Sequence, residues 1–149
     1  MNRTLDTTEY LEAVIALLDE GHENIPVPVT GTSMCPFLHP GDTVYLCRCN
    51  GAFHPGDVVL YRRNEGSFVL HRIHRMGKHG SVWITGDNQT ALEAVDSQKQ
   101  IIAIVSSVSR KGRLLTPSSL VWLFYSSVWR WLRPLRPLLG KLHHITKAR

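Results

Sequence analysis

Turn-forming residues interrupt the stretch 25–113 at short intervals, and this spacing constrains the fold more than any other feature of the sequence. The runs between the turns are short and rich in β-branched residues, which is typical of strands. The pattern therefore predicts a mainly β, compact, antiparallel-rich fold. The predicted strands are Val27–Thr30, Thr43–Cys47, Asp57–Arg62, Ser67–Arg75, Ser81–Thr85 and Gln100–Val108. The turns between them are marked by Pro36, Pro40-Gly41, Pro55-Gly56, Asn64-Glu65-Gly66, Gly77, Gly80 and Gly86-Asp87-Asn88.

A helix is predicted before the β region. Thr7 or Thr8 can cap its start, and Gly21 ends it. We expect its apolar face to pack on the β domain, with docking to a partner or precursor as the alternative. Because Met1–Thr8 is polar, no secretory signal is expected. The apolar face consists of Leu11, Val14, Ile15 and Leu18, which recur at helical spacing.

The charge of the chain is unevenly distributed. Residues 1–109 carry 8 Lys/Arg and 12 Asp/Glu, whereas residues 110–149 carry 9 Lys/Arg and no acid. This division suggests an amphipathic helix over 1–24, a β domain over 25–115 and a basic, aromatic-rich tail over 116–149.

Within the tail, Ser118-Ser119 can cap a helix that runs through Leu132. Its Trp, Tyr and Leu side chains and its cations predict that 117–149 associates with an anionic membrane surface. A helix packed on the domain with a solvated basic end is the alternative, and a membrane-spanning helix is a third interpretation.

The three cysteines, Cys35, Cys47 and Cys49, are too few and too oddly spaced for a disulfide framework. We therefore expect reduced thiols and a location on the cytoplasmic side of a membrane, with the outer face as the alternative. A zinc site that combines these cysteines with His71 and His74 is an alternative, but C-x-C is an atypical spacing for zinc. We therefore expect no metal and no cofactor.

Residues 29–46 contain a serine on a tight turn between two predicted strands. Such a serine can be exposed, with its own N–H directed at a bound carbonyl, as acyl transfer requires. The string Gly-Thr-Ser-Met-Cys-Pro-Phe-Leu-His-Pro-Gly-Asp around Ser33 resembles the nucleophile box of the signal peptidase I superfamily of serine peptidases. Three further boxes, His54–Tyr61, Val69–Ile73 and Ile84–Asn88, resemble those of the superfamily and stand in the same order.

The resemblance implies a signal-peptidase-like β fold in which Ser33 is the nucleophile and His71 is the base. Other branches have a Lys base, so His71 is similar to the archaeal, sporulation-associated and endoplasmic-reticulum branch. That branch typically has two supporting acids, which here fall on Asp87 and Glu93. We expect both acids near His71, without deciding which one bonds the imidazole, and Asp96 could substitute for Glu93.

Strand parity supports His71 as the base. In Ser67–Arg75 it shares a face with Val69 and Ile73, whose apolar side chains exclude water. His74 lies on the opposite face and is the rival candidate.

The nucleophile turn is expected to supply the oxyanion hole through the Ser33 N–H. Asp42 and Asp57, each after a Gly, are expected to hold turns. The residues of the turn around the nucleophile are Gly31, Thr32 and Met34.

These features favour a serine endopeptidase that cleaves signal- or leader-type peptides of a precursor. The alternative function is a non-catalytic β module that binds an anionic membrane, or nucleic acid, through its tail. We expect no nucleic-acid partner. Self-cleavage is disfavoured because residues 1–24 contain no Ala-Gly or Cys-Gly pair.

Overall fold

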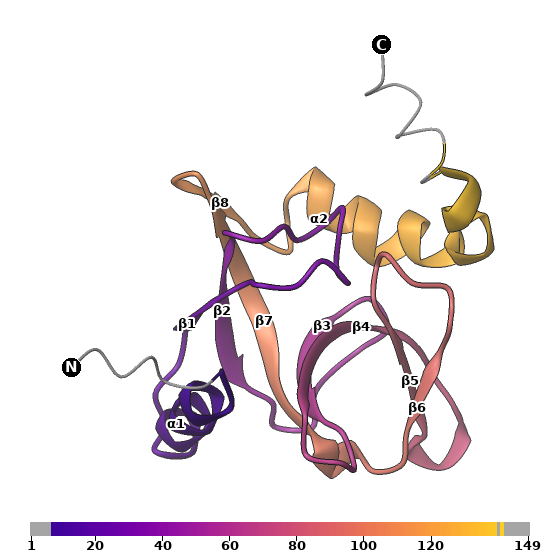
Figure 1. The fold of residues 1–149 in the computed structure, drawn as a ribbon. Coiled ribbons are helices and arrows are strands. Elements are labelled where there is room, and N and C mark those ends of the chain that lie inside the picture. The colour runs from indigo at the N-terminus through magenta and orange to yellow at the C-terminus, as the bar shows by residue number, and fades with distance from the viewer. Residues whose placement is uncertain (1–6, 140, 142–149) are drawn as a thin grey trace.

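The computed structural model of the chain describes residues 7–139 and 141, and the rest of the predicted tail lies outside the described residues. The described chain forms an eight-stranded antiparallel sheet in the order β1-β2-β7-β3-β4-β5-β6, with β8 paired to β7 (Figure 1). This confirms the prediction of a mainly β fold. The strands are β1 (Ile25–Pro28), β2 (Thr43–Arg48), β3 (Val58–Arg62), β4 (Phe68–Met76), β5 (Val82–Thr85), β6 (Glu93–Val95), β7 (Ile101–Arg110) and β8 (Arg113–Leu115).

The strand β7 joins two halves of the sheet. It is ten residues long and pairs with β2 on one side and β3 on the other. The β2 side therefore contains β1 and β2, and the β3 side contains the consecutive hairpins β3 to β6 (Figure 1). The short strand β8 pairs with the last residues of β7, on the edge opposite β2. A residue between β1 and β2 can consequently meet one in β4 only because β7 brings the two halves together.

Each of the six predicted strands is present, with each end within two residues of the predicted one. Two short strands were missed. The strand β6 begins with Glu93 and has only three residues, too few for an alternation pattern. The strand β8 follows a tight turn in which Lys111 and Gly112 both have positive φ angles, and Lys-Gly is a weak hairpin signal.

Two hydrophobic cores form on opposite faces of the sheet. Alternate residues of β3 separate between them, since Val58 and Leu60 enter the first core and Val59 and Tyr61 enter the second. The first core also receives the helix α1 (Thr7–Asp19), which packs through Leu11, Val14 and Leu18.

The tail packs across the domain. The helix α2 (Leu120–Phe124) begins after Ser119, whose side chain accepts a hydrogen bond from the Trp122 N–H, and a π-helical turn follows over Tyr125–Trp129. Trp122 is buried in the first core, with its ring edge-on to that of Phe37 at 5.3 Å between centroids. None of the described helices is long and apolar enough to cross a membrane.

A close approach shows how tightly the tail is seated. A Cβ atom on Gly56 would lie 2.7 Å from the backbone oxygen of Ser126, and the φ angle of this glycine is +100°. Only glycine fits at this position, which lies in the loop between β2 and β3. The inner face of the tail is therefore part of the folded domain, as in the packed-helix alternative.

Candidate active site

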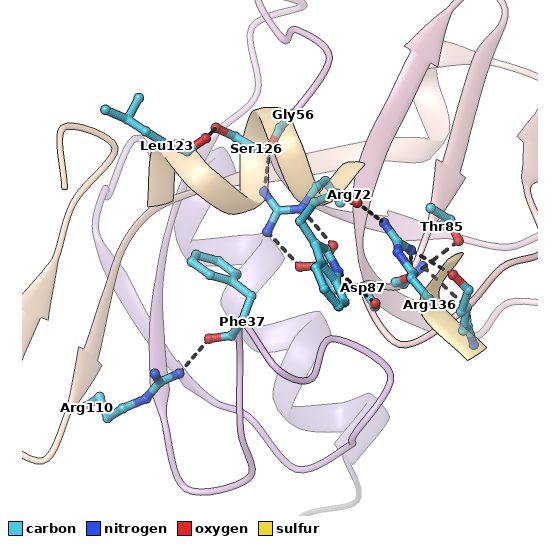
Figure 2. Close-up of polar contacts among 12 residues, drawn as sticks. Phe37, Gly56, Arg72, Thr85, Asp87, Arg110, Leu123, Ser126 and Arg136 are labelled. Carbon is cyan, nitrogen blue, oxygen red and sulfur yellow. Dashed lines mark hydrogen bonds and ion pairs between the residues drawn. The ribbon is translucent and has the colours of Figure 1, made fainter. Parts of the chain in front are cut away.

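The nucleophile turn is held by buried apolar side chains. Ser33 lies in the loop between β1 and β2, where Met34, Phe37 and Leu38 are all buried in the first core. The Arg110 guanidinium donates to the Phe37 carbonyl oxygen, so the loop is also tied to the end of β7 (Figure 2). The turn is thus fixed on its inner side while the half-buried Ser33 side chain stays accessible.

Two aspartates hold adjacent turns. Asp42 accepts a hydrogen bond from the His39 N–H at 2.8 Å, and Asp57 accepts one from the His54 N–H at 2.7 Å. Both turns have the Pro-Gly-Asp pattern, and the structure agrees with the predicted role. Asp42 also pairs with Arg110 at 2.6 Å, which orders the exit of the nucleophile loop.

His71 meets Ser33 across the two halves of the sheet. The residue lies in β4 opposite Val59 of β3, and its side chain is only 3% exposed. Its Nε2 atom is 3.1 Å from the Ser33 Oγ atom, although the two residues are 38 positions apart in the chain. With the ring proton on Nδ1, Nε2 can accept the proton of the serine hydroxyl.

Neither expected acid makes a hydrogen bond to His71. The Nδ1 atom of His71 is buried and has no hydrogen-bond partner among the described residues. Arginines bind both carboxylates instead, Arg72 holding Asp87 and Arg63 holding Glu93. The expectation that one of these acids bonds the imidazole is therefore wrong for this conformation, because the nearby guanidinium groups compete for the carboxylates.

Glu93 nevertheless acts on His71 through its charge. Both residues line the same cavity, and the Glu93 carboxylate accepts hydrogen bonds from the Tyr61 hydroxyl and the Arg63 guanidinium, each at 2.8 Å. Burial, followed by the Arg63 charge, lowers the pKa of His71 to about 4, while the Glu93 charge opposes this shift. The imidazole is accordingly neutral at pH 7, which is the form that a general base requires. Asp96, which was expected as a possible substitute for Glu93, accepts a hydrogen bond from the Asn64 side chain instead.

Asp87 is part of a buried ion pair that holds loops together. Arg72 donates to the two Asp87 carboxylate oxygens at 2.8 and 2.7 Å and to the Gly56 carbonyl oxygen at 2.7 Å (Figure 2). Its guanidinium also stacks over the Phe37 ring, 4.7 Å from the centroid. Both members of the pair are almost completely buried, so removing one would leave an uncompensated charge.

The loop between β5 and β6 supports the backbone of the nucleophile. The Asn88 N–H donates to the Ser33 carbonyl oxygen at 2.9 Å. A Cβ atom on Gly86 would lie 2.5 Å from that same oxygen, so only glycine allows this approach. The Gly-Asp-Asn box therefore positions Ser33 through its backbone, and the Asp87 side chain anchors the loop.

Residues of the tail also donate hydrogen bonds to this loop between β5 and β6. The Trp129 indole donates to the Asp87 carbonyl oxygen at 3.0 Å. Arg136 donates to the carbonyl oxygens of Gly86 and Gln89 at 2.9 and 2.7 Å. Residues predicted to lie in a separate tail segment thus contribute to the support of the site.

The Ser–His pair lies between two cavities. Ser33 lines an apolar groove of about 430 Å³, and His71 lines a more polar cavity of about 600 Å³. Gly31 borders the groove next to Ser33, whereas the Thr32 side chain is exposed. The apolar groove is formed by α1, β1, the loop between β1 and β2, and the first half of β4. Its lining includes Tyr10, Val27, Val29, Met34, Phe68 and Leu70.

His74 lies away from the nucleophile. A register irregularity in β4 follows Ile73, and the His74 ring packs against that of Trp131 at 5.8 Å between centroids. Arg130 of the tail donates to its carbonyl oxygen. Among the described residues, no group of three or more His, Cys, Asp or Glu side chains could hold a metal ion, and all three cysteines are free.

Sequence reasoning missed three residues around the pair, namely Tyr61, Arg63 and Arg72. Arg72 had a usable signal, because a cation in the middle of an apolar strand requires a partner when the strand is buried. The sequence contains no such signal for Arg63 and Tyr61. Each contacts Glu93, which is 30 positions from Arg63 and 32 from Tyr61, and a local pattern does not reveal contacts at that separation.

A serine hydroxyl and a neutral imidazole at hydrogen-bonding distance, beside an apolar groove in a β domain, are the arrangement of the serine peptidase class. The Peptidase S24-like family model matches residues 2–108, and the chain belongs to this family. No curated protein and no solved structure matches the chain. This family is consistent with the serine peptidase superfamily that the sequence motifs indicate. The match does not show that the chain belongs to the signal-peptidase branch of that superfamily.

Proposed function

We propose that this chain is a serine endopeptidase of the His-base type that cleaves signal- or leader-type peptides. The observation that carries the proposal is the 3.1 Å separation of the Ser33 Oγ and His71 Nε2 atoms. A general base must lie within such a distance of the proton that it removes. The Peptidase S24-like match supports the peptidase class, and the use of His71 where other branches have Lys supports the branch.

In the first step, Ser33 Oγ attacks the scissile carbonyl carbon while His71 Nε2 takes the hydroxyl proton. The Ser33 N–H donates to no other group among the described residues, so it is free to stabilise the oxyanion. The C–N bond then breaks, and His71 returns the proton to the leaving amine. Water then attacks the acyl carbon while His71 takes its proton. The ester bond to Ser33 Oγ breaks, Oγ takes the proton back from His71, and the carboxylate product leaves.

The groove fits an extended peptide on the acyl side. Its apolar lining is formed partly by the edge strand β1, and Ser33 lies on the groove wall. An extended peptide can add to such an edge through its backbone. The leaving amine would face His71 and the polar cavity. Small side chains near the scissile bond are the preference that the family resemblance implies.

Glu93 is the acid that assists His71 in this proposal. Its charge favours the imidazolium that forms during acyl transfer, since it opposes the lowering of the His71 pKa. The Arg63 and Tyr61 hydrogen bonds hold the carboxylate in place. Asp87 supports the nucleophile through the loop that it anchors and is a structural residue.

The test is covalent labelling by a small fluorophosphonate together with cleavage of a leader-type peptide. Ser33→Ala should abolish labelling, and His71→Gln should lower its rate by about 10²–10⁴-fold. His74→Gln is a matched control, because this histidine is on the same strand, is also buried and has no serine partner. Labelling that survives Ser33→Ala would refute the proposal, as would equal effects of the two histidine variants. A module that only binds would give no signal that depends on Ser33.

A further inference from the structure

The tail presents an apolar outer surface that the folded domain does not cover. Eleven large hydrophobic side chains are exposed among the described residues, and eight of them lie in the tail. Six of these recur every three or four residues along the successive α-helical, π-helical and 3-10 turns of the tail, and we call these six the outer face. The outer face consists of Leu120, Phe124, Val128, Trp131, Leu135 and Leu138.

The opposite side of the tail is already occupied. Trp122, Trp129 and Arg136 recur every seven residues, and all three contact the β domain. No other element among residues 7–139 lies beyond the tail on its outer side (Figure 1). The outer face is therefore largely free of the β domain. Leu120 is 84% exposed, and Trp131, which meets the His74 ring at 5.8 Å between centroids, is still 69% exposed. Exposed apolar surface of this extent marks an interaction site.

The charge of the C-terminal region selects the partner of the outer face. Residues 110–149 carry nine cations and no acid, and Lys111, Arg113 and Lys141 are exposed. A second copy of the chain on this face would set one basic tail against another, which like-charge repulsion opposes. The headgroups and acyl chains of an anionic bilayer match both the cations and the apolar side chains.

We propose that the outer face docks in the interface of an anionic lipid membrane while the tail stays packed on the domain. Trp131 lies at headgroup depth, where its ring is stabilised by both environments, and the Arg130 guanidinium lies over that ring at 5.3 Å. The tail lies flat and does not leave the domain, because Trp122, Trp129 and Arg136 hold it there without using the outer face. The edge contact of Trp131 with His74 leaves most of its ring exposed. This inference concerns binding alone and holds whether or not Ser33 is catalytic.

The experiment measures co-sedimentation of the full chain with vesicles. Vesicles of phosphatidylcholine with about 30% phosphatidylglycerol should bind the wild type, and phosphatidylcholine alone should bind it at least about tenfold more weakly. The triple variant Leu120→Ser/Trp131→Ser/Leu138→Ser should lose at least about tenfold in binding to the anionic vesicles. The control Leu17→Ser/Met76→Ser changes two exposed apolar residues outside the tail and should bind like the wild type.

Folding is checked by the thermal midpoint of each variant. If the triple variant does not fold, quenching of wild-type tryptophan fluorescence by brominated anionic lipid replaces it, and strong quenching is expected from Trp131 at the interface. Three outcomes overturn the proposal. They are no binding of the wild type to anionic vesicles, equal binding of the triple variant, and lipid-free dimerisation that the triple variant abolishes. The last outcome would assign the outer face to a second copy of the chain.

Discussion

The substitution Gly86→Ala tests whether the β5–β6 loop positions the nucleophile. The new Cβ atom would lie 2.5 Å from the Ser33 carbonyl oxygen, whereas ordinary contacts begin at 3.4 Å. The two backbone segments must therefore separate by about 0.9 Å. Both atoms belong to the backbone or are fixed to it, so a side-chain rotation cannot relieve the contact.

The displacement acts on the distance that the proposed chemistry needs. Moving the Ser33 backbone weakens its hydrogen bond from Asn88 and shifts Ser33 Oγ from its position 3.1 Å from His71 Nε2. A misplacement of about 1 Å can cost about 10²-fold in rate. This corresponds to about 2.7 kcal/mol of transition-state stabilisation at 1.36 kcal/mol per tenfold. We expect a further loss of about 1–3 kcal/mol in the free energy of unfolding.

The assay is the second-order rate constant for fluorophosphonate labelling of Ser33, measured below the thermal midpoint. Gly31→Ala is the matched control, because a Cβ there meets no atom within 4 Å and its φ angle is not in the left-handed region. It should label within about threefold of the wild type, since no contact changes. If folded Gly86→Ala also labelled at the wild-type rate, the loop would not position the nucleophile.

Three further predictions concern stability and pH. Arg72→Met leaves the buried Asp87 unpaired and should lower the free energy of unfolding by about 3–5 kcal/mol in urea denaturation, and a loss below about 1 kcal/mol would contradict this. Trp122→Ala empties part of the first core and should cost about 3–5 kcal/mol in the same assay, so an unchanged midpoint would contradict the packing. The pKa values of His71 and His74 are lowered to about 4, chiefly by burial, so the unfolded chain binds more protons between about pH 6.5 and 4. Stability should fall as pH drops through this window, and Ser33 labelling should persist below pH 6 and fall only near pH 4. A labelling midpoint near pH 6.5 would show that His71 is not buried in the working enzyme.

The strands that carry the site could be predicted closely because their signals are local. The Pro-Gly-Asp turns and the β-branched runs between them depend only on neighbouring residues, and the strand with His71 was predicted within one residue at each end. The pairing of Ser33 with His71 was predicted from motif order, and the 3.1 Å separation agrees with it.

The partners of the acids could not be predicted in the same way. Asp87 and Glu93 follow His71 at plausible spacing, but the sequence does not say that Arg72 and Arg63 reach them first. Which cation binds a carboxylate depends on the distances among several strands. The composition of the tail was equally ambiguous, because an apolar, basic segment can pack, dock or do both.

The amino-acid sequence by itself determined the elements, the turns and the residue types available for chemistry, since these follow from periodicity and from the conformational limits of Gly and Pro. Only the tertiary structure decided which groups meet. The strand β7 joins the half that holds Ser33 to the half that holds His71, and packing on the β domain separates the inner side of the tail from its outer face. Both results depend on long-range contacts, for which a local pattern of residues carries no distance information.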